Sequence, residues 1–190
     1  MEMTKLSCEK FLAELASKAP TPGGGGTAAD YVGWTLALEG VAAASAVPLA
    51  RGAGTVNVYF VPAADAPEGL DGQVSAALEE RRPVGADVRA IRAQSTAVNV
   101  SAAVTLAAGS ALDQVKSGFS QAMETWLAGV RLREQGEKVS LSRVIGILMN
   151  VPGVEDVGSV LLNGKNEAVT VGTGKYAVLG TVTVTEADHG

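Results

Sequence analysis

Cysteine and histidine are almost absent from this sequence of 190 residues. It contains one cysteine, Cys8, and one histidine, His189, which is the penultimate residue. A single cysteine excludes an internal disulfide and any zinc site built from several cysteines. A single histidine near the chain end also disfavours hydrolytic triads and histidine metal sites. Cys8 falls on the apolar face of an expected helix, where a buried and unreactive thiol is the usual case.

Aromatic side chains and basic charge are also scarce. Aromatic residues make up 4% of the chain, so a core must be built from valine, leucine and alanine. The net charge of −5 argues against nucleic acid as a partner, because phosphate neutralisation requires clustered lysine and arginine. The one basic pair, Arg81 and Arg82, is interpreted as a solvated helix end. Four large apolar side chains are expected in a core rather than around a cofactor; they are Trp34, Phe119, Met123 and Trp126.

Long apolar runs are missing as well. No run approaches the roughly 20 residues that a helix needs to span a bilayer. The N-terminus also lacks the uninterrupted apolar core of a signal peptide. These absences predict a soluble protein that is made in a cytoplasm, is not secreted and has no membrane partner. The apolar content of 47% is typical of a globular chain with room for one large domain or two small ones.

The hydrophobic pattern predicts an α+β fold of two similar small units with mainly antiparallel sheets, preceded by a short N-terminal helix. The expected boundaries are residues 1–26 for that helix (8–18) and a Pro/Gly linker, 27–93 for the first unit and 94–190 for the second. Further helices are expected from Thr27 to Gly40 and over 70–80, 111–127 and 141–149. Strands are expected over 41–49, 55–61, 87–93, 96–106, 154–162, 168–171 and 176–185. Residues 131–138 are expected to form a charged connector.

A weak internal repeat supports the similarity of the two units. Gly40-Val41 and Gly153-Val154 each follow an expected helix and lead into a strand. Gly54-Thr-Val and Gly180-Thr-Val each lie in or before a later strand. The alternative is that valine-rich strands resemble each other by chance.

The run Gly23–Gly26 is the strongest candidate for a ligand loop. A glycine loop that opens a helix can bind an anion at the helix N-terminus. No Gly-Lys-Ser/Thr follows the run, however, and a Gly-x-Gly-x-x-Gly pattern from Gly23 fails at Ala28. No strand is expected before it either, so a linker is favoured over an anion site.

Acidic residues are scattered over expected loops and helix ends, where solvated surface is the favoured interpretation. A general acid–base pair would need two of these carboxylates in one pocket. The residues considered are Asp65, Glu68, Asp71, Glu79, Glu80, Glu155 and Asp156. They do not compose a catalytic set, so no catalytic, cofactor-binding or metal-binding residue is predicted.

From about residue 25 to residue 190 the chain resembles the baseplate J-like proteins of contractile-tailed phages and related injection machines. The matching stretches, in family order, are Gly25-Gly-Thr-Ala-Ala-Asp-Tyr31, Glu39-Gly-Val41, Pro48-Leu-x-Arg51-Gly-x-Gly54-Thr-Val56, Glu80-Arg-Arg-Pro-Val-Gly85, Leu141-Ser-Arg143, Val151-Pro-Gly-Val-Glu-Asp-Val157 and Val178-Leu-Gly-Thr-Val182. The resemblance implies a non-enzymatic structural subunit of the baseplate wedge, located in the virion tail and assembled in the host cytoplasm. Its implied partners are other baseplate or tail proteins and copies of itself in a ring.

Residues 5–26 resemble a different family, the N-terminus of the formiminotransferase-cyclodeaminase/methenyltetrahydrofolate cyclohydrolase proteins. The stretch runs from Lys5-Leu-Ser-Cys8 to the end of the glycine run. That family implies a helical bundle acting on folate, but strand-rich sequence follows here, so a folate site would be incomplete. The hypotheses are therefore a baseplate subunit, a folate-handling enzyme fragment, and a natural or engineered chimera joined within Gly23–Gly26.

Overall fold

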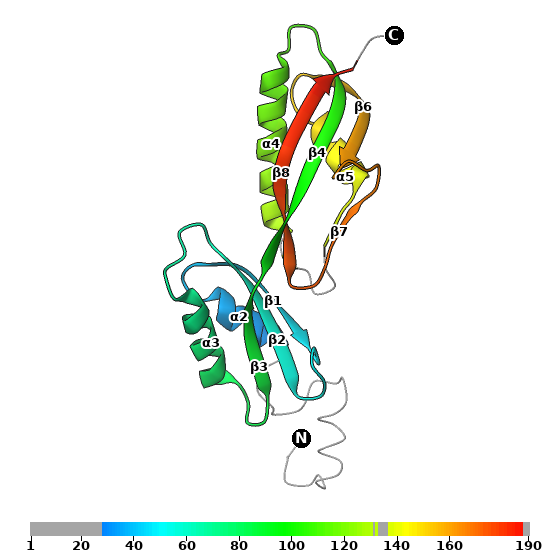
Figure 1. The fold of residues 1–190 in the computed structure, drawn as a ribbon. Helices are drawn as coiled ribbons and strands as arrows, with labels where there is room; N and C mark the ends of the chain where they lie inside the picture. The colour runs from blue at the N-terminus through cyan, green and yellow to red at the C-terminus, as the bar shows by residue number, and fades with distance from the viewer. Residues whose placement is uncertain (1–27, 131, 133–136, 188–190) are drawn as a thin grey trace, which may run out of the picture. The chain divides into compact units, whose positions relative to one another are not determined.

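The computed structural model describes residues 28–130, 132 and 137–187 (Figure 1). The chain divides into two compact units, and the second begins at Gln94. The α+β class is confirmed, as are mainly antiparallel sheets: three strand pairings are antiparallel and two are parallel among the described strands. The helix expected over residues 8–18 and the linker after it lie outside the described residues.

The first unit is a three-stranded sheet with helices packed on one face. Its elements are α2 (Ala28–Leu36), β1 (Val41–Pro48), β2 (Thr55–Pro62), α3 (Leu70–Arg81) and β3 (Asp87–Arg92). The sheet order is β1-β2-β3, with β1 antiparallel and β3 parallel to the central strand. A parallel neighbour requires a crossover connection, and α3 provides it between β2 and β3.

Alternate residues of β2 form the centre of the first core. Val58 and Phe60 are fully buried and pack in one cluster with Tyr31 of α2. Leu70, Val74 and Leu78 supply the buried stripe of α3, at the spacing of one helical face. The strand expected over residues 55–61 is thus confirmed, with Val58 and Phe60 on its core face.

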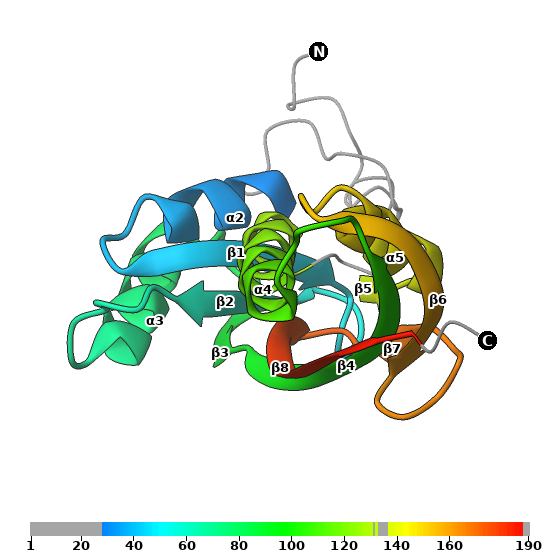
Figure 2. The ribbon, with the colours of Figure 1, turned by 90° about the horizontal axis from the view of Figure 1, so that it is seen from above.

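The second unit repeats the combination of a three-stranded sheet and two helices. Its elements are β4 (Gln94–Leu106), α4 (Leu112–Gly129), β5 (Glu137–Val139), α5 (Leu141–Met149), β6 (Val154–Leu162), β7 (Val169–Val171) and β8 (Lys175–Glu186). The sheet order is β6-β4-β8, with β6 antiparallel and β8 parallel to β4. Figure 2 shows α4 and α5 along the same face of this curved sheet.

The second core is built as the alternation of β4 predicts. The buried positions are every second residue of the strand, namely Val98, Val100, Ala102 and Val104. They pack with the buried stripe of α4, which consists of Val115, Phe119, Met123 and Leu127. Burying each large apolar side chain contributes about 1.5–3 kcal/mol, so this stripe fixes α4 on the sheet.

Two expected boundaries are corrected by the structure. Glu137 and Lys138, expected in the charged connector, instead belong with Val139 to β5, which pairs antiparallel with β7. Three residues are too few to show an alternating pattern, and Val139 is the one apolar member of the strand. Helix α2 ends at Leu36, whereas Gly40, with a φ of 87°, ends the turn that enters β1.

Of the two glycine pairs in the expected internal repeat, one pair is equivalent in the structure and the other is not. Gly40 and Gly153 both have positive φ, at 87° and 94°, and both precede the strand antiparallel to the central one. Gly54 and Gly180 are not equivalent, because Gly54 lies in a turn and Gly180 lies inside β8. A Cβ on Gly180 would overlap the side chain of Asn99, so a close contact explains this glycine.

Candidate interaction surfaces

The residues considered from the sequence do not assemble into a chemical site. Cys8, Gly23–Gly26 and His189 lie outside the described residues, so the expectations for them stay predictions. The acidic residues are exposed, and two of them have arginine partners: Asp71 binds Arg92, and Glu79 binds Arg82. In the described part of the chain, no three histidine, cysteine or acidic residues come together in a way that could hold a metal ion.

The four large side chains expected in a core lie in or beside the two cores, but they are not buried to the same extent. Phe119 and Met123 are fully buried. Trp34 and Trp126 are half-buried at the margins of the two cores. The ring of Trp34 makes an edge-to-face contact with the ring of Tyr31, with 5.4 Å between the ring centres. In addition, none of the described helices is long and apolar enough to cross a membrane.

Arg51 fixes the turn between β1 and β2 against β3. Its guanidinium forms an ion pair with the carboxylate of Asp87, and its Nη2 donates to the backbone carbonyl of Asp87 at 3.1 Å. Nε donates to Oδ1 of Asn57 at 3.0 Å, so the planar group bridges two strands. This hydrogen-bonded pair lowers the pKa of the Asp87 carboxyl below its ordinary value. The turn stretch around Arg51 therefore has a structural role.

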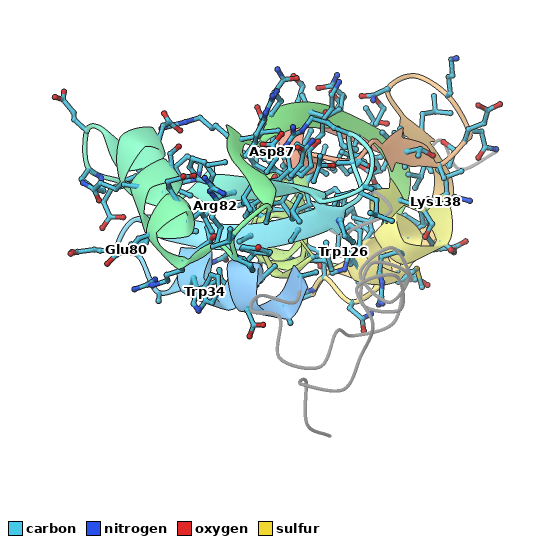
Figure 3. The ribbon with its side chains drawn as sticks, turned by 90° about the horizontal axis from the view of Figure 1, so that it is seen from below. Trp34, Glu80, Arg82, Asp87, Trp126 and Lys138 are labelled. Atoms are coloured by element: carbon cyan, nitrogen blue, oxygen red, sulfur yellow. The ribbon has the colours of Figure 1, made fainter. Side chains whose placement is uncertain are left out.

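Arg82 corrects the interpretation of the basic pair as a solvated helix end. Its guanidinium binds both carboxylate oxygens of Glu79, and Nη1 donates to the carbonyl of Ala86 at 2.8 Å. The carboxyl pKa of Glu79 is lowered by this hydrogen-bonded arginine. Figure 3 labels Arg82 together with Glu80, whose side chain points away from the sheet. Only Arg81 is exposed as expected.

Two turns at one end of the first sheet display apolar side chains to solvent. Leu49 is 51% exposed in the β1–β2 turn, and Val84 is fully exposed in the turn between α3 and β3. The turns share one end of the sheet because Thr55 pairs with Asp87 at the start of the parallel strands. We refer to Leu49 and Val84, with their turns at residues 48–54 and 83–86, as the turn surface.

The turn surface is held rigidly despite its exposure. Backbone N–H of Asp87 donates to the carbonyl of Gly54 at 2.9 Å, which joins the two turns. The backbone of Leu49 has a φ of 58°, a left-handed conformation that costs a non-glycine residue roughly 1 kcal/mol. The two turns are thus joined by hydrogen bonds, while Leu49 and Val84 remain exposed to solvent.

A second surface feature lies between the two helices of the second unit. It is a depression of about 390 Å³ lined by residues from α4 and by α5 and the turn after it. Its lining is Gly118, Ala122, Arg143, Gly146, Ile147, Asn150, Val151 and Pro152. We refer to this depression as the helix groove. Its floor is formed mainly by small and apolar residues, which favours contact with a side chain over chemistry.

Comparison with known proteins gives these surfaces a context. Residues 23–92 match the baseplate J-like central domain, and residues 98–185 match the baseplate J-like protein C-terminal domain. The chain is 28% identical over 173 residues to the uncharacterized protein YqbT of Bacillus subtilis (strain 168). This match covers 83% of this chain and 47% of that protein. It is 25% identical over 166 residues to the phage-like element PBSX protein XkdT of the same organism, covering 82% and 47% of the two chains.

A solved structure shares the fold. The cryo-EM structure of the anti-feeding prophage baseplate, 6-fold symmetrised, contains a chain that matches with a TM-score of 0.61 and 12% identity. The match covers 85% of this chain and 37% of that one. The chain also spans about half the length of the curated relatives that it matches.

The described residues thus form two α+β units, each a three-stranded sheet with two helices. Over most of its length the chain consists of the central and C-terminal domains of the baseplate J-like family. The baseplate J-like resemblance of residues 25–190 is thereby confirmed. The resemblance of residues 5–26 to the cyclodeaminase family, and with it the chimera, stays a prediction.

Proposed function

We propose that the chain is a structural part of the baseplate wedge of a contractile phage-type tail. It acts through contacts with other baseplate proteins and with copies of itself in a ring, without enzymatic activity. The family matches support this role, and so does the occurrence of the same fold in a solved baseplate. The place of action is the tail of the particle, after assembly in the host cytoplasm.

The observation that carries the proposal is the turn surface of the first unit. Val84 is fully exposed, and Leu49 is half-exposed with a left-handed backbone. Both residues lie in turns that hydrogen bonds and an ion pair connect. Solvent gives no stabilisation to apolar side chains in such positions, whereas a partner with a matching hollow does. We therefore assign the turn surface to contact with a neighbouring subunit.

A matched pair of substitutions tests this assignment. Val84→Asp places a charge in the turn surface, and Ala64→Asp places the same charge on an exposed loop at the other end of the same sheet. Each variant is introduced into the tail genes in place of the natural residue, and assembled particles are counted by electron microscopy. The proposal predicts normal tails with Ala64→Asp and few or none with Val84→Asp, at equal melting temperatures of the purified chains. Normal assembly with Val84→Asp would contradict it.

The folate hypothesis is separated from this proposal by a binding measurement. Saturable binding of a tetrahydrofolate derivative, or cyclohydrolase turnover, would favour an enzyme fragment. We expect neither, because a baseplate role requires surfaces rather than a folate pocket.

A further inference from the structure

Four arginines lie in the stretches shared with the baseplate J-like family, and their surroundings differ; Arg81 is the exposed last residue of α3. Arg51 and Arg82 are bound to carboxylates of their own unit. Arg143 is exposed and forms no ion pair within the described part of the chain. Arg51 and Arg82 thus hold turns together, whereas Arg143 has no carboxylate partner among the described residues.

Arg143 is nevertheless held in place. Its guanidinium carbon lies 6.0 Å from the centre of the Trp126 ring, the outer limit of a cation–π contact. Ser140 caps the helix that carries it, because its side-chain oxygen accepts from the backbone N–H of Arg143 at 3.3 Å. The guanidinium thus has an aromatic neighbour on which it can stack, and the side chain remains exposed.

The helix groove lies directly beside this arginine. Among its described lining residues, Arg143 carries the only charge. A second depression of about 390 Å³ borders the start of α5 and is lined by Ser140, Ser142, Arg143 and Gly146. Arg143 and Gly146 therefore border both depressions, with an apolar hollow on one side and hydroxyl groups on the other.

This arrangement favours one chemistry of partner. A depression of this volume accommodates one or two side chains rather than a whole helix. Apolar walls favour an aliphatic side chain, and an unpaired guanidinium at the rim favours a carboxylate, which it can bind through two parallel hydrogen bonds. A basic segment would meet repulsion from Arg143 with no acidic lining residue to offset it.

We propose that the helix groove binds a short segment of a neighbouring protein that carries an aliphatic side chain next to a carboxylate. The aliphatic group enters the hollow between Gly118, Ala122 and Gly146, and the carboxylate binds Arg143. This contact is separate from the turn surface, since every residue of it lies in the second unit. A negative result in the test of one surface would therefore not contradict the assignment of the other surface.

The test uses Trp126 as a built-in reporter. The chain has two tryptophans, so its 15N NMR spectrum has two indole N–H signals, and Trp34 in the first unit serves as the internal control. The probes are short blocked peptides that alternate leucine with glutamate, leucine with glutamine, leucine with lysine, and serine with glutamate. Inorganic phosphate is titrated separately, because the start of α5 could attract a free anion.

Two variants and one control complete the design. Arg143→Ala removes the charge. Gly146→Leu fills the groove, and it is compatible with folding because a Cβ at Gly146 meets nothing within 4 Å and helix interiors favour leucine over glycine. Lys165→Ala removes an exposed charge from a turn of the same unit that does not line the groove.

The expected result is that the leucine–glutamate peptide shifts the Trp126 signal and leaves the Trp34 signal unchanged. Binding weakens about tenfold or more in Arg143→Ala and in Gly146→Leu, and it is retained in Lys165→Ala. The proposal is overturned if the Trp126 signal does not move, if the glutamine or lysine peptide binds equally well, or if binding survives in Gly146→Leu. A response to phosphate equal to the response to the peptide would also overturn it, since the groove would then be a simple anion site.

Discussion

The guanidinium of Arg51, in the turn after β1, binds the carboxylate of Asp87, the first residue of β3. The ion pair connects the two turns that present Leu49 and Val84. Arg89 also lies near Asp87, with 3.8 Å between Nε and the second carboxylate oxygen. Leu49 and Val84 thus lie on turns that this ion pair connects.

Asp87→Asn is expected to lower the melting temperature slightly at neutral pH, because the substitution removes the carboxylate that binds Arg51. The carboxyl pKa of Asp87 is lowered in the folded chain, chiefly by the hydrogen bond from Arg51. A lowered folded pKa stabilises the fold above the ordinary aspartate value of about 3.9, and this contribution disappears as the pH falls further. Thermal unfolding from pH 7 to pH 2 should show the difference between variant and wild type shrink below about pH 4. A constant difference would show that Asp87 acts through something other than its charge.

Leu49→Asn is expected to raise the free energy of unfolding by about 0.5–1 kcal/mol, because asparagine tolerates the left-handed backbone better than leucine does. The same variant should impair tail assembly, since it removes an apolar contact side chain. Leu36→Asn is the control for the loss of an exposed leucine, because Leu36, the last residue of α2, is also exposed. If both variants assemble normally, the strain at Leu49 has no role in contact.

Gly153→Ala is expected to destabilise the second unit by roughly 2 kcal/mol or more. Its φ of 94° disfavours any side chain, and an added Cβ would lie 2.9 Å from Oγ of Ser110 and 3.3 Å from Cγ2 of the buried Val115. Gly109→Ala separates the two causes, because Gly109 has a φ of 83° and no atom within 4 Å of the added Cβ. Chemical denaturation of both variants measures the difference. Equal losses would mean that the close contact with Ser110 contributes nothing.

Phe119→Ala is expected to cost about 3–5 kcal/mol, the range for deleting a large aromatic side chain from a packed core. Phe119 is fully buried between α4 and the β6-β4-β8 sheet. Trp126→Phe is the contrasting variant, because Trp126 is only half-buried at the margin of the same core. Urea unfolding should show a much smaller loss for Trp126→Phe, and a loss as large as that of Phe119→Ala would contradict the assigned core.

The sequence predicted those elements whose pattern is long enough to repeat. The alternation of β4 and the apolar stripe of α4 each extend over several repeats, and both were placed correctly. β5 has three residues, of which two are charged, so its pairing with β7 could not be recognised locally. Likewise, the parallel pairing of β4 with β8 joins residues about 80 positions apart, and only the folded core specifies such a pairing.

The surfaces were less predictable than the cores. Leu49 is an ordinary apolar residue in the sequence, and nothing local indicates its left-handed backbone. Arg82 follows a helix and is adjacent to Arg81, so composition favoured solvation, whereas its partners Glu79 and Ala86 become apparent only with the turn in place. One signal was available: Glu79 lies three residues before Arg82, a spacing at which helical side chains meet. Exposure depends on tertiary packing, and for that reason the turn surface and the helix groove required the structure.

The most direct test of the structural role is quantitative mass spectrometry of contractile tail particles purified from the organism that encodes the chain. The role predicts that peptides from both units occur in intact particles at a fixed ratio to other baseplate proteins, and that Val84→Asp removes them from the particles. Absence of the chain from intact tails, with the protein free in the lysate, would contradict a baseplate function.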